Sequence, residues 1–274
     1  MTTRGGAFYD APGRAGLYLG HRHGGVDSPN VVMEEPAFLD ELGALPGLRV
    51  LDLGCGDAAV GRTLLDGGCA SYLGLDGSAE MVAAAAERLA GTAGRVERAD
   101  IEDFSAPDGS FDLVISRMAL HYVADLGAAL SACARALAPG GRVLFTVAHP
   151  VITSHDARPE GRRTSWLVDD YFRPGPRERD WLGAAVTWHH RTIEEQVAAL
   201  TGAGFALTAL RECAPRPERF HGNQAELARR RRVPLFLLLA GRLPDAATPP
   251  PPPSPAPPAF RRMTRPPARR PPEA

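Results

Sequence analysis

The sequence contains no lysine, and all 31 of its basic residues are arginine. This absence excludes a lysine Schiff base with pyridoxal phosphate and a lysine-containing phosphate loop. Cysteine is scarce as well: Cys55, Cys69, Cys133 and Cys213 lie far apart, without a Cys-x-x-Cys pair. Neither a zinc site nor a disulfide framework is indicated, so we expect no bound metal and a reducing, cytoplasmic compartment.

Long apolar runs and a strong net charge are also missing. The longest apolar run, residues 235–240, is too short to span a bilayer, and residues 1–6 lack the apolar core of a signal peptide. The formal net charge of -1 gives no electrostatic reason to expect nucleic acid or a membrane surface as partner. We expect a small-molecule partner, and the sequence leaves monomer and homodimer equally open.

A glycine-containing turn organises the rest of the chain. Residues 50–53 favour a strand, Gly54-Cys55-Gly56 follows directly, and residues 58–66 continue without a proline, as in a helix. Glycines at such a turn let the backbone approach a ligand, while free N–H groups at the start of the helix face the same place. The pattern predicts a ligand-binding turn at the carboxyl end of a strand.

Strand and helix patterns alternate after this turn, which predicts a doubly wound α/β fold with a mostly parallel seven-stranded sheet. The last two strands, without a comparable helix between them, predict an antiparallel edge hairpin. Asp125 is positioned to cap one helix and Thr192 begins a capping box for another. The predicted strands are 50–53, 71–75, 96–99, 111–115, 142–147, 205–210 and 233–240. The predicted helices are 36–45, 58–66, 79–89, 126–137 and 192–201. We expect Pro139-Gly140-Gly141 to end the fourth of these helices.

Composition divides the chain into three parts. Residues 1–47 form an expected N-terminal helical cap, and residues 48–242 form the main domain. Within it, the segment 149–190 breaks the alternation and contains all three tryptophans; we expect a long irregular lid. Residues 243–274 hold 13 of the 26 prolines and five arginines, a composition typical of a disordered tail.

Two ligand classes fit the turn on these grounds alone. A dinucleotide or S-adenosylmethionine (SAM) would each use Asp76, the acidic residue at the end of the second strand, to bind ribose hydroxyls. Ala59 satisfies the third small position of a dinucleotide fingerprint. The two classes therefore remain open at this point.

Ordered motifs beyond the turn resemble the class I SAM-dependent methyltransferases. They are Val50 to Gly56, Asp100-Ile101-Glu102, the strand 111–116 followed by Arg117 to Tyr122, and the segment 137–142. The resemblance covers roughly residues 5–240 and extends to a bacterial small-molecule branch, the methyltransferase type 11-like proteins. It implies a SAM cofactor bound by Tyr9, Tyr18, Asp52, Gly54, Cys55, Gly56, Asp76, Gly77, Met81, Asp100, Ile101, Glu102, Ser116 and Arg117.

Methyl transfer needs alignment of acceptor and methyl group, and some acceptors also need a general base. Histidine suits this task near neutral pH. His149, at the carboxyl end of the fifth strand, is our first candidate, followed by His121 and Tyr122. His190 precedes a helix cap, so we expect it to orient or pack.

The aromatic insertion indicates an aromatic or apolar acceptor, because rings give a large contact area. The candidate substrate-contacting residues are Trp166, Tyr171, Trp181, Trp188 and His190. The acceptor atom, nitrogen, carbon or oxygen, stays open.

The bias towards arginine and alanine, without lysine, favours a high-GC bacterium and specialised natural-product metabolism. Two alternatives remain: an NAD(P)-dependent oxidoreductase, or an inactive methyltransferase-fold binding protein.

Overall fold

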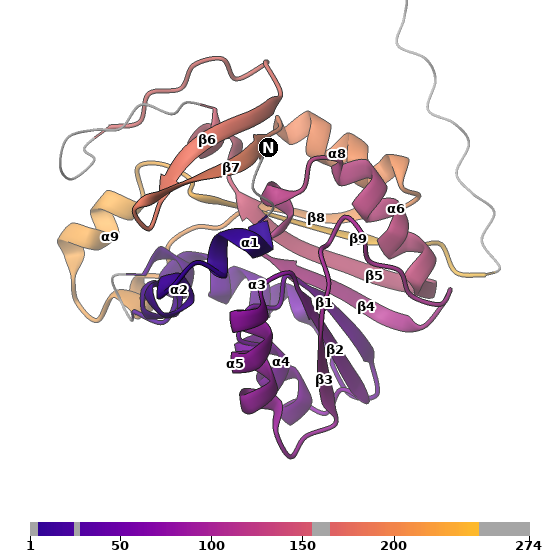
Figure 1. Ribbon diagram of the computed structural model, residues 1–274. Coiled ribbons are helices and arrows are strands. Elements are labelled where there is room, and N and C mark those ends of the chain that lie inside the picture. The colour runs from indigo at the N-terminus through magenta and orange to yellow at the C-terminus, as the bar shows by residue number, and fades with distance from the viewer. Residues whose placement is uncertain (1–4, 25–27, 155–164, 247–274) are drawn as a thin grey trace, which may run out of the picture.

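The structure, a computed structural model, describes residues 5–24, 28–154 and 165–246. Figure 1 shows a twisted central sheet with helices on both faces. Its strands are β1 (Arg49–Leu53), β2 (Ser71–Asp76), β3 (Gly94–Arg98), β4 (Phe111–Arg117), β5 (Leu137–Ala148), β8 (Ala206–Glu212) and β9 (Phe236–Arg242). Two further strands, β6 (Gly175–Trp181) and β7 (Ala184–His190), form a separate two-stranded sheet.

Helices alternate with these strands along the chain. The α-helices are α1 (Gly5–Tyr9), α2 (Arg14–Arg22), α3 (Glu35–Leu42), α4 (Ala59–Asp66), α5 (Ala79–Leu89), α6 (Leu126–Ala136), α7 (Pro150–Thr153), α8 (Ile193–Gly202) and α9 (Gln224–Arg230). Shorter elements are the π-helix η2 (Asn30–Glu34) and the 3-10 turns η3 (Leu120–Tyr122) and η4 (Pro217–Phe220). The predicted tail lies outside the described residues from position 247 onward.

The central sheet has the order β3-β2-β1-β4-β5-β9-β8. Strands β1 to β5 run parallel, whereas β9 is antiparallel to both β5 and β8. The predicted doubly wound, mostly parallel seven-stranded sheet is confirmed, as is the antiparallel final pair. One detail differs: η4 and α9 lie between β8 and β9, where no helix was predicted.

Alternation along the strands explains why both faces are covered. Leu113 and Ile115 of β4 pack in the cluster that includes α3, α4 and α5, while Val114 packs in the cluster that includes α6 and α8. A strand buried on both faces needs apolar residues at consecutive positions. Helices therefore cover both faces of the sheet, and a ligand-binding site is expected at the edge where the parallel strands end.

Helix starts follow the side chains that cap them. The Asp125 carboxylate accepts from Ala128 N–H at 2.9 Å, and Thr192 and Glu195 form the reciprocal capping box, so both predicted caps are confirmed. The predicted helix 126–137 ends one residue earlier than expected, at Ala136, whereas the next strand, predicted from residue 142, already begins at Leu137. The Pro-Gly-Gly segment thus belongs to the start of a strand.

The segment after β5 is more regular than predicted. Residues 150–153 form α7, and β6 and β7 make an antiparallel hairpin whose two-residue turn is Leu182-Gly183. Both turn residues have positive φ, 50° and 77°, as a type I′ turn requires. The prediction of an irregular segment is wrong for this hairpin, and residues 155–164 lie outside the described residues. Figure 1 shows the hairpin above α1, where β7 contacts η3 and α1.

Within the described ranges, no helix is long and apolar enough to cross a membrane.

Candidate functional site

The turn after β1 is held between the ends of β1 and β2. Gly54 N–H donates to Leu75 O at 2.8 Å, and Gly56 N–H donates to Asp76 Oδ2 at 2.9 Å. Gly54 has φ 71°, and a Cβ there would lie 2.3 Å from the Cβ of Ala119. Glycine is required at this position for conformation and for space. The turn therefore places main-chain atoms, not covered by a side chain, against the segment that follows β4.

A cavity of about 640 Å³ opens beside this turn, next to the carboxyl ends of β1, β2 and β4. The predicted residues that line it are Tyr9, Tyr18, Gly54, Gly56, Asp76, Gly77, Met81, Asp100, Ile101, Glu102, Arg117 and Tyr122. Gly5, Gly6, Met118, Ala119 and Val123 also line it, although sequence reasoning missed them. Most of the predicted cofactor residues therefore share one cavity.

Helix α1 reaches this cavity because two glycines let it approach the turn after β2. A Cβ on Gly6 would lie 2.5 Å from the carbonyl carbon of Gly77. Asp10 fixes the approach by accepting from the Ser78 hydroxyl at 2.7 Å. The Gly-Gly pair at the start of α1 is the sequence signal that could have placed this helix at the site.

Asp76 presents a buried carboxylate to the cavity. Its Oδ1 accepts from Ser78 N–H and its Oδ2 from Gly56 N–H, both at 2.9 Å. Burial raises the pKa of Asp76, and the two backbone hydrogen bonds oppose that rise. Each carboxylate oxygen keeps a further lone pair, so Asp76 can accept hydroxyl donors from a ligand.

A second cavity, of about 790 Å³, lies on the other side of the same turn. It shares Tyr18, Gly54, Gly56 and Arg117 with the first and adds the predicted residues Asp52 and Cys55, together with Arg22. Burial raises the pKa of Asp52 to about 7, although Tyr72 donates its hydroxyl to the carboxylate at 2.7 Å. The predicted residue Ser116 lines neither cavity, because its buried hydroxyl donates to Leu53 O at 2.7 Å.

A buried ion pair with Glu34 holds Arg117, which lines both cavities, in place. Glu34, at the end of η2, accepts from Arg117 Nε at 3.0 Å and Nη2 at 2.6 Å, and from the Thr146 hydroxyl at 2.7 Å. Burial alone would raise the pKa of Glu34, but the charges of Arg117 and Arg22 outweigh burial and lower it. Sequence reasoning gave Glu34 no role in the site, since nothing local distinguishes a buried glutamate from an exposed one.

A cluster of aromatic rings adjoins the cavity: three tyrosines line it, and two tryptophans of the hairpin pack next to them. The Tyr9 and Tyr122 hydroxyls are 2.8 Å apart, and the Tyr9 ring packs on Tyr18 at 4.9 Å. The hairpin adds Trp188, at 6.3 Å from Tyr122, and Trp181, at 6.3 Å from Trp188. Two predicted substrate residues thus adjoin the predicted cofactor residues.

His121 lies inside this cluster, 4.7 Å from the Trp188 ring. It is buried, and neither ring nitrogen has a hydrogen-bond partner among the described residues. Burial, with smaller contributions from the charges of Arg191 and Arg179, lowers the pKa of His121 to about 3. The imidazole is therefore neutral at physiological pH, with a donor and an acceptor available.

His149, the first candidate base, lies outside both cavities. Its Nδ1 accepts from Val151 N–H at 3.1 Å, as the N-cap of α7, and its Nε2 is 3.1 Å from Glu212 Oε1. Burial lowers the pKa of His149, while Glu212 opposes that change. The structure gives both ring nitrogens protein neighbours and does not bring this histidine together with the cofactor candidates.

The other predicted substrate residues lie farther along the insertion. His190 is held by Thr153 Oγ1 at 2.6 Å from Nδ1 and by Tyr171 O at 2.9 Å from Nε2. The Tyr171 ring packs on His190 at 5.7 Å. Trp166 lines a separate cavity with the end of α9 and the residues that precede β9. None of these three lines the cavity at the glycine turn.

The described residues contain no group of three His, Cys, Asp or Glu side chains positioned to hold a metal ion.

A family model described as a methyltransferase domain matches residues 51–145. The solved S-adenosylmethionine-dependent methyltransferase from Mesorhizobium loti is 36% identical, with a TM-score of 0.71, over 80% of this chain and 100% of that chain. An uncharacterised protein from Haemophilus influenzae is 28% identical over 78% of this chain and 88% of its own length.

A third relative is the malonyl-[acyl-carrier protein] O-methyltransferase of Enterobacter lignolyticus, 35% identical over 49% of this chain. The match spans 50% of that protein's length. The similarity is therefore extensive for the Mesorhizobium loti and Haemophilus influenzae proteins and partial for this one.

Proposed function

The chain belongs to the SAM-dependent methyltransferases, and from that premise we propose that it methylates a nitrogen, carbon or oxygen atom of an aromatic or apolar small molecule. The observation that carries the proposal is the aromatic cluster of Tyr9, Tyr122, Trp181 and Trp188 beside the cavity at the glycine turn. Aromatic walls favour flat apolar partners. The arginine and alanine bias supports a role in bacterial specialised metabolism.

The described residues fit SAM as cofactor. Two adjoining cavities share the glycine turn, one with the Asp76 carboxylate and three tyrosine rings, the other with two guanidinium groups. When bound, SAM supplies an electrophilic methyl group on a cationic sulfur. Asp76 would accept hydrogen bonds from the ribose hydroxyls, while Met81, Asp100 and Ile101, which line the same cavity, would contact the adenine. Aromatic faces next to the sulfonium stabilise its positive charge.

Arg22 is suited to the carboxylate at the other end of the cofactor. Its side chain is 12% exposed, and its Nη1 forms an ion pair with Glu34 Oε2 at 3.6 Å but makes no hydrogen bond with the described residues. A guanidinium with an unused donor binds carboxylates through charge-assisted hydrogen bonds. We assign Arg22 to the carboxylate of the methionine portion, with Arg117 held in place by Glu34.

The candidate bases are better suited to orienting the acceptor than to removing a proton from it. Burial raises the pKa of Tyr122 well above its usual value, His121 is neutral with a pKa of about 3, and His149 contacts Glu212. Efficient general bases have pKa values near the working pH. The site therefore favours an amine nitrogen or an aromatic carbon, which needs little help from a base, over an alcohol oxygen.

Calorimetric titration with S-adenosylhomocysteine (SAH) tests the cofactor assignment without knowledge of the acceptor. We expect the wild type to bind SAH and Asp76→Ala to bind it about 10- to 100-fold more weakly, because charged hydrogen bonds to two ribose hydroxyls are lost. Asp66→Ala, an exposed carboxylate that pairs with Arg62, is the matched control. A wild type that does not bind SAH would refute the function, whereas unchanged affinity in Asp76→Ala would refute only the residue role.

The two alternatives are separated by different observations. The nicotinamide alternative depended on Gly54, Gly56, Ala59 and Asp76, whereas the family to which the chain belongs uses SAM as its cofactor. The inactive binding protein differs from the enzyme only in turnover. Release of SAH from SAM during incubation with aromatic amines would therefore exclude it.

A further inference from the structure

Asp10, the first residue after α1, joins that helix to α5 and β3. Its Oδ1 accepts from the Ser78 hydroxyl at 2.7 Å and from Glu80 N–H at 3.4 Å, and its Oδ2 lies 3.0 Å from Arg98 Nη2. Burial would raise the pKa of Asp10, but the hydrogen bonds from Ser78 and Glu80 and the charge of Arg98 outweigh burial and lower it. Asp10 is therefore a carboxylate anion at neutral pH.

Ser78 connects Asp10 to two residues of the cofactor cavity. Its side chain is buried, its N–H donates to Asp76 Oδ1 at 2.9 Å, and its hydroxyl oxygen accepts from Met81 N–H at 3.2 Å as the N-cap of α5. A hydroxyl has one proton, and an ionised carboxylate can only accept. The Ser78 proton therefore points to Asp10, which leaves its lone pairs for Met81. Asp76 and Met81 both line the cavity.

Arg98, at the end of β3, contacts α1 and the turn after β2 with one guanidinium group. Its Nε donates to Gly77 O at 3.1 Å, while its Nη2 donates to Asp10. Gly77 lies directly against α1, because a Cβ on Gly77 would be 3.1 Å from the Cα of Gly6. The same arginine thus holds both sides of this close contact.

Helix α1 depends on such contacts for its position. It has only five residues, and a helix of that length is not stable without tertiary packing. Three of its residues, Gly5, Gly6 and Tyr9, line the cofactor cavity. Asp10 itself lines neither cavity at the glycine turn. Its carboxylate therefore acts on the site through α1 and through Ser78.

We propose that Asp10 is a positioning residue that forms a latch with Ser78 and Arg98, and that this latch holds α1 over the cofactor and slows the release of SAM and SAH. The proposal rests on the proposed function, since it concerns how the same site retains its cofactor. Opening of the latch separates Asp10 from Ser78 and Arg98 and moves one wall of the cavity. Asp76 and the glycine turn stay in place.

Release of tritiated SAH from the full chain, after dilution into excess unlabelled SAH, tests the latch. We expect Asp10→Ala to raise the dissociation rate about tenfold, because the buried Ser78 hydroxyl loses a charged acceptor. Asp10→Asn keeps an acceptor for Ser78 and should give an intermediate rate. Arg98→Gln should raise the rate only about threefold, since the Arg98 side chain is 60% exposed.

The double variant of Asp10→Ala and Arg98→Gln shows whether the two residues act together. Because Arg98 acts largely through Asp10, we expect the double variant to release SAH at the rate of Asp10→Ala alone. Independent effects would multiply to an increase of about 30-fold. A general loss of stability would produce that larger increase, so the comparison separates a latch from a merely structural contribution.

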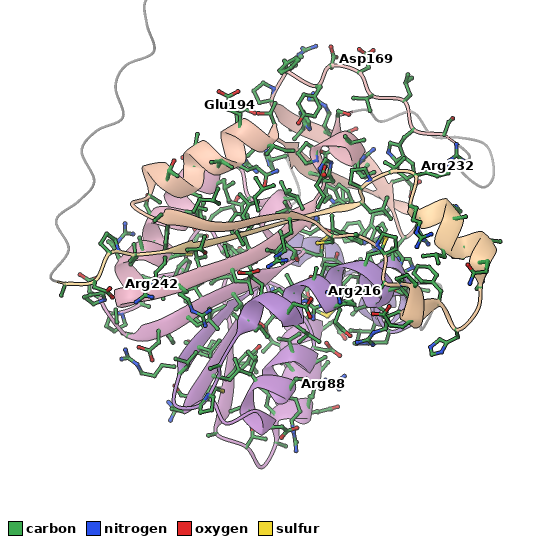
Figure 2. All side chains as sticks on the ribbon, turned by 180° about the vertical axis from the view of Figure 1, so that it is seen from behind. Arg88, Asp169, Glu194, Arg216, Arg232 and Arg242 are labelled. Atoms are coloured by element: carbon green, nitrogen blue, oxygen red, sulfur yellow. The ribbon has the colours of Figure 1, made fainter. Side chains whose placement is uncertain are left out.

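Asp245→Ala is the matched control, since Asp245 forms an exposed pair with Arg242 at 2.9 Å. Figure 2 shows Arg242 at the far end of β9, and Arg242 pairs with Arg142 of β5, six residues before the carboxyl end of that strand at Ala148. This pair therefore lies away from the edge where the parallel strands end. The control should release SAH at the wild-type rate.

The outcomes separate the latch from the function on which it rests. A dissociation rate of Asp10→Ala equal to that of the wild type overturns the latch, as does an increase of about 30-fold in the double variant. Both results leave the methyltransferase function intact, because the wild type binds SAH in each. A wild type that binds no SAH contradicts the function, and the latch is overturned with it.

Discussion

Asp52 carries a buried carboxylate beneath the glycine turn, and its burial has a consequence for stability at different pH values. The pKa of Asp52 is raised by burial from 3.8 to about 7. Between those values the unfolded chain releases the proton while the folded chain keeps it, so stability falls as pH rises through this window. Asp52→Asn removes the titration and keeps an acceptor for Tyr72. We expect the variant to gain stability relative to the wild type from pH 4 to pH 7.

Urea unfolding at pH 4, 5.5, 7 and 8 measures this difference. The gain should be smallest at pH 4, grow to about 1 kcal/mol or more by pH 7, because one unit of pKa shift corresponds to about 1.4 kcal/mol, and change little above it. Asp108→Asn, an exposed aspartate, should show no such trend. A difference between Asp52→Asn and wild type that is constant with pH would mean that Asp52 titrates normally in the fold.

Single residues differ in how far the sequence predicts their place. The cavity contains Gly54, Asp76 and Ile101 as expected, because each lies at or just after the end of a strand, and parallel strands end at one edge of the sheet. His149 also follows a strand, yet its ring turns to Glu212. Ring orientation depends on neighbours from β8, which are distant in sequence. Local pattern therefore predicts the edge of the sheet, and packing decides the direction of a side chain.

At the scale of elements, the β6–β7 hairpin carries Trp181 and Trp188, and its turn has an unfavourable backbone conformation. Leu182 has φ 50°, a conformation that costs a residue with a Cβ about 1 to 2 kcal/mol and that asparagine tolerates better. We expect Leu182→Asn to exceed Leu182→Ala in free energy of unfolding by about 1 kcal/mol. The alanine variant is the control, since both substitutions remove the leucine contacts. Thermal unfolding checks the order, and equal stabilities would mean that the turn relaxes without strain.

The same turn explains why this element was not predicted. A two-residue hairpin is usually indicated by Asn-Gly or Asp-Gly, and Leu-Gly lacks that signal. Strand β6 is also rich in charged residues, as in Arg177, Glu178 and Arg179, and it pairs with β7 alone. Elements buried in the main sheet keep a strong apolar pattern, as β4 does. A surface hairpin does not need one.

At the scale of the whole molecule, sheet order and helix coverage follow from the alternation of strands and helices, whereas the meeting of distant segments does not. Tyr9 and Tyr122 are 113 residues apart in sequence, and their hydroxyls form a hydrogen bond. Trp181 contacts His21 although the two lie in different parts of the chain. No short-range signal encodes such contacts. They arise because α1, α2 and the hairpin all pack at the carboxyl edge of one sheet.

This arrangement predicts that cofactor binding fastens the N-terminal helices to the rest of the protein. Tyr9 and Tyr18 line the cofactor cavity from α1 and α2, so a ligand held there must leave before these helices separate. A ligand at 100 times its Kd stabilises the bound form by about 2.7 kcal/mol, which is about a 100-fold change in the population of the open form. Where separation of the two helices limits proteolysis, we expect SAH to slow tryptic cleavage after Arg14 and Arg22 by about 100-fold. Without lysine, trypsin cleaves this chain after arginine only. Cleavage after the exposed Arg219, which lines neither cavity at the glycine turn, is the internal control, monitored by mass spectrometry. Equal protection at all three arginines would mean that SAH stabilises the whole fold without selectively closing α1 and α2.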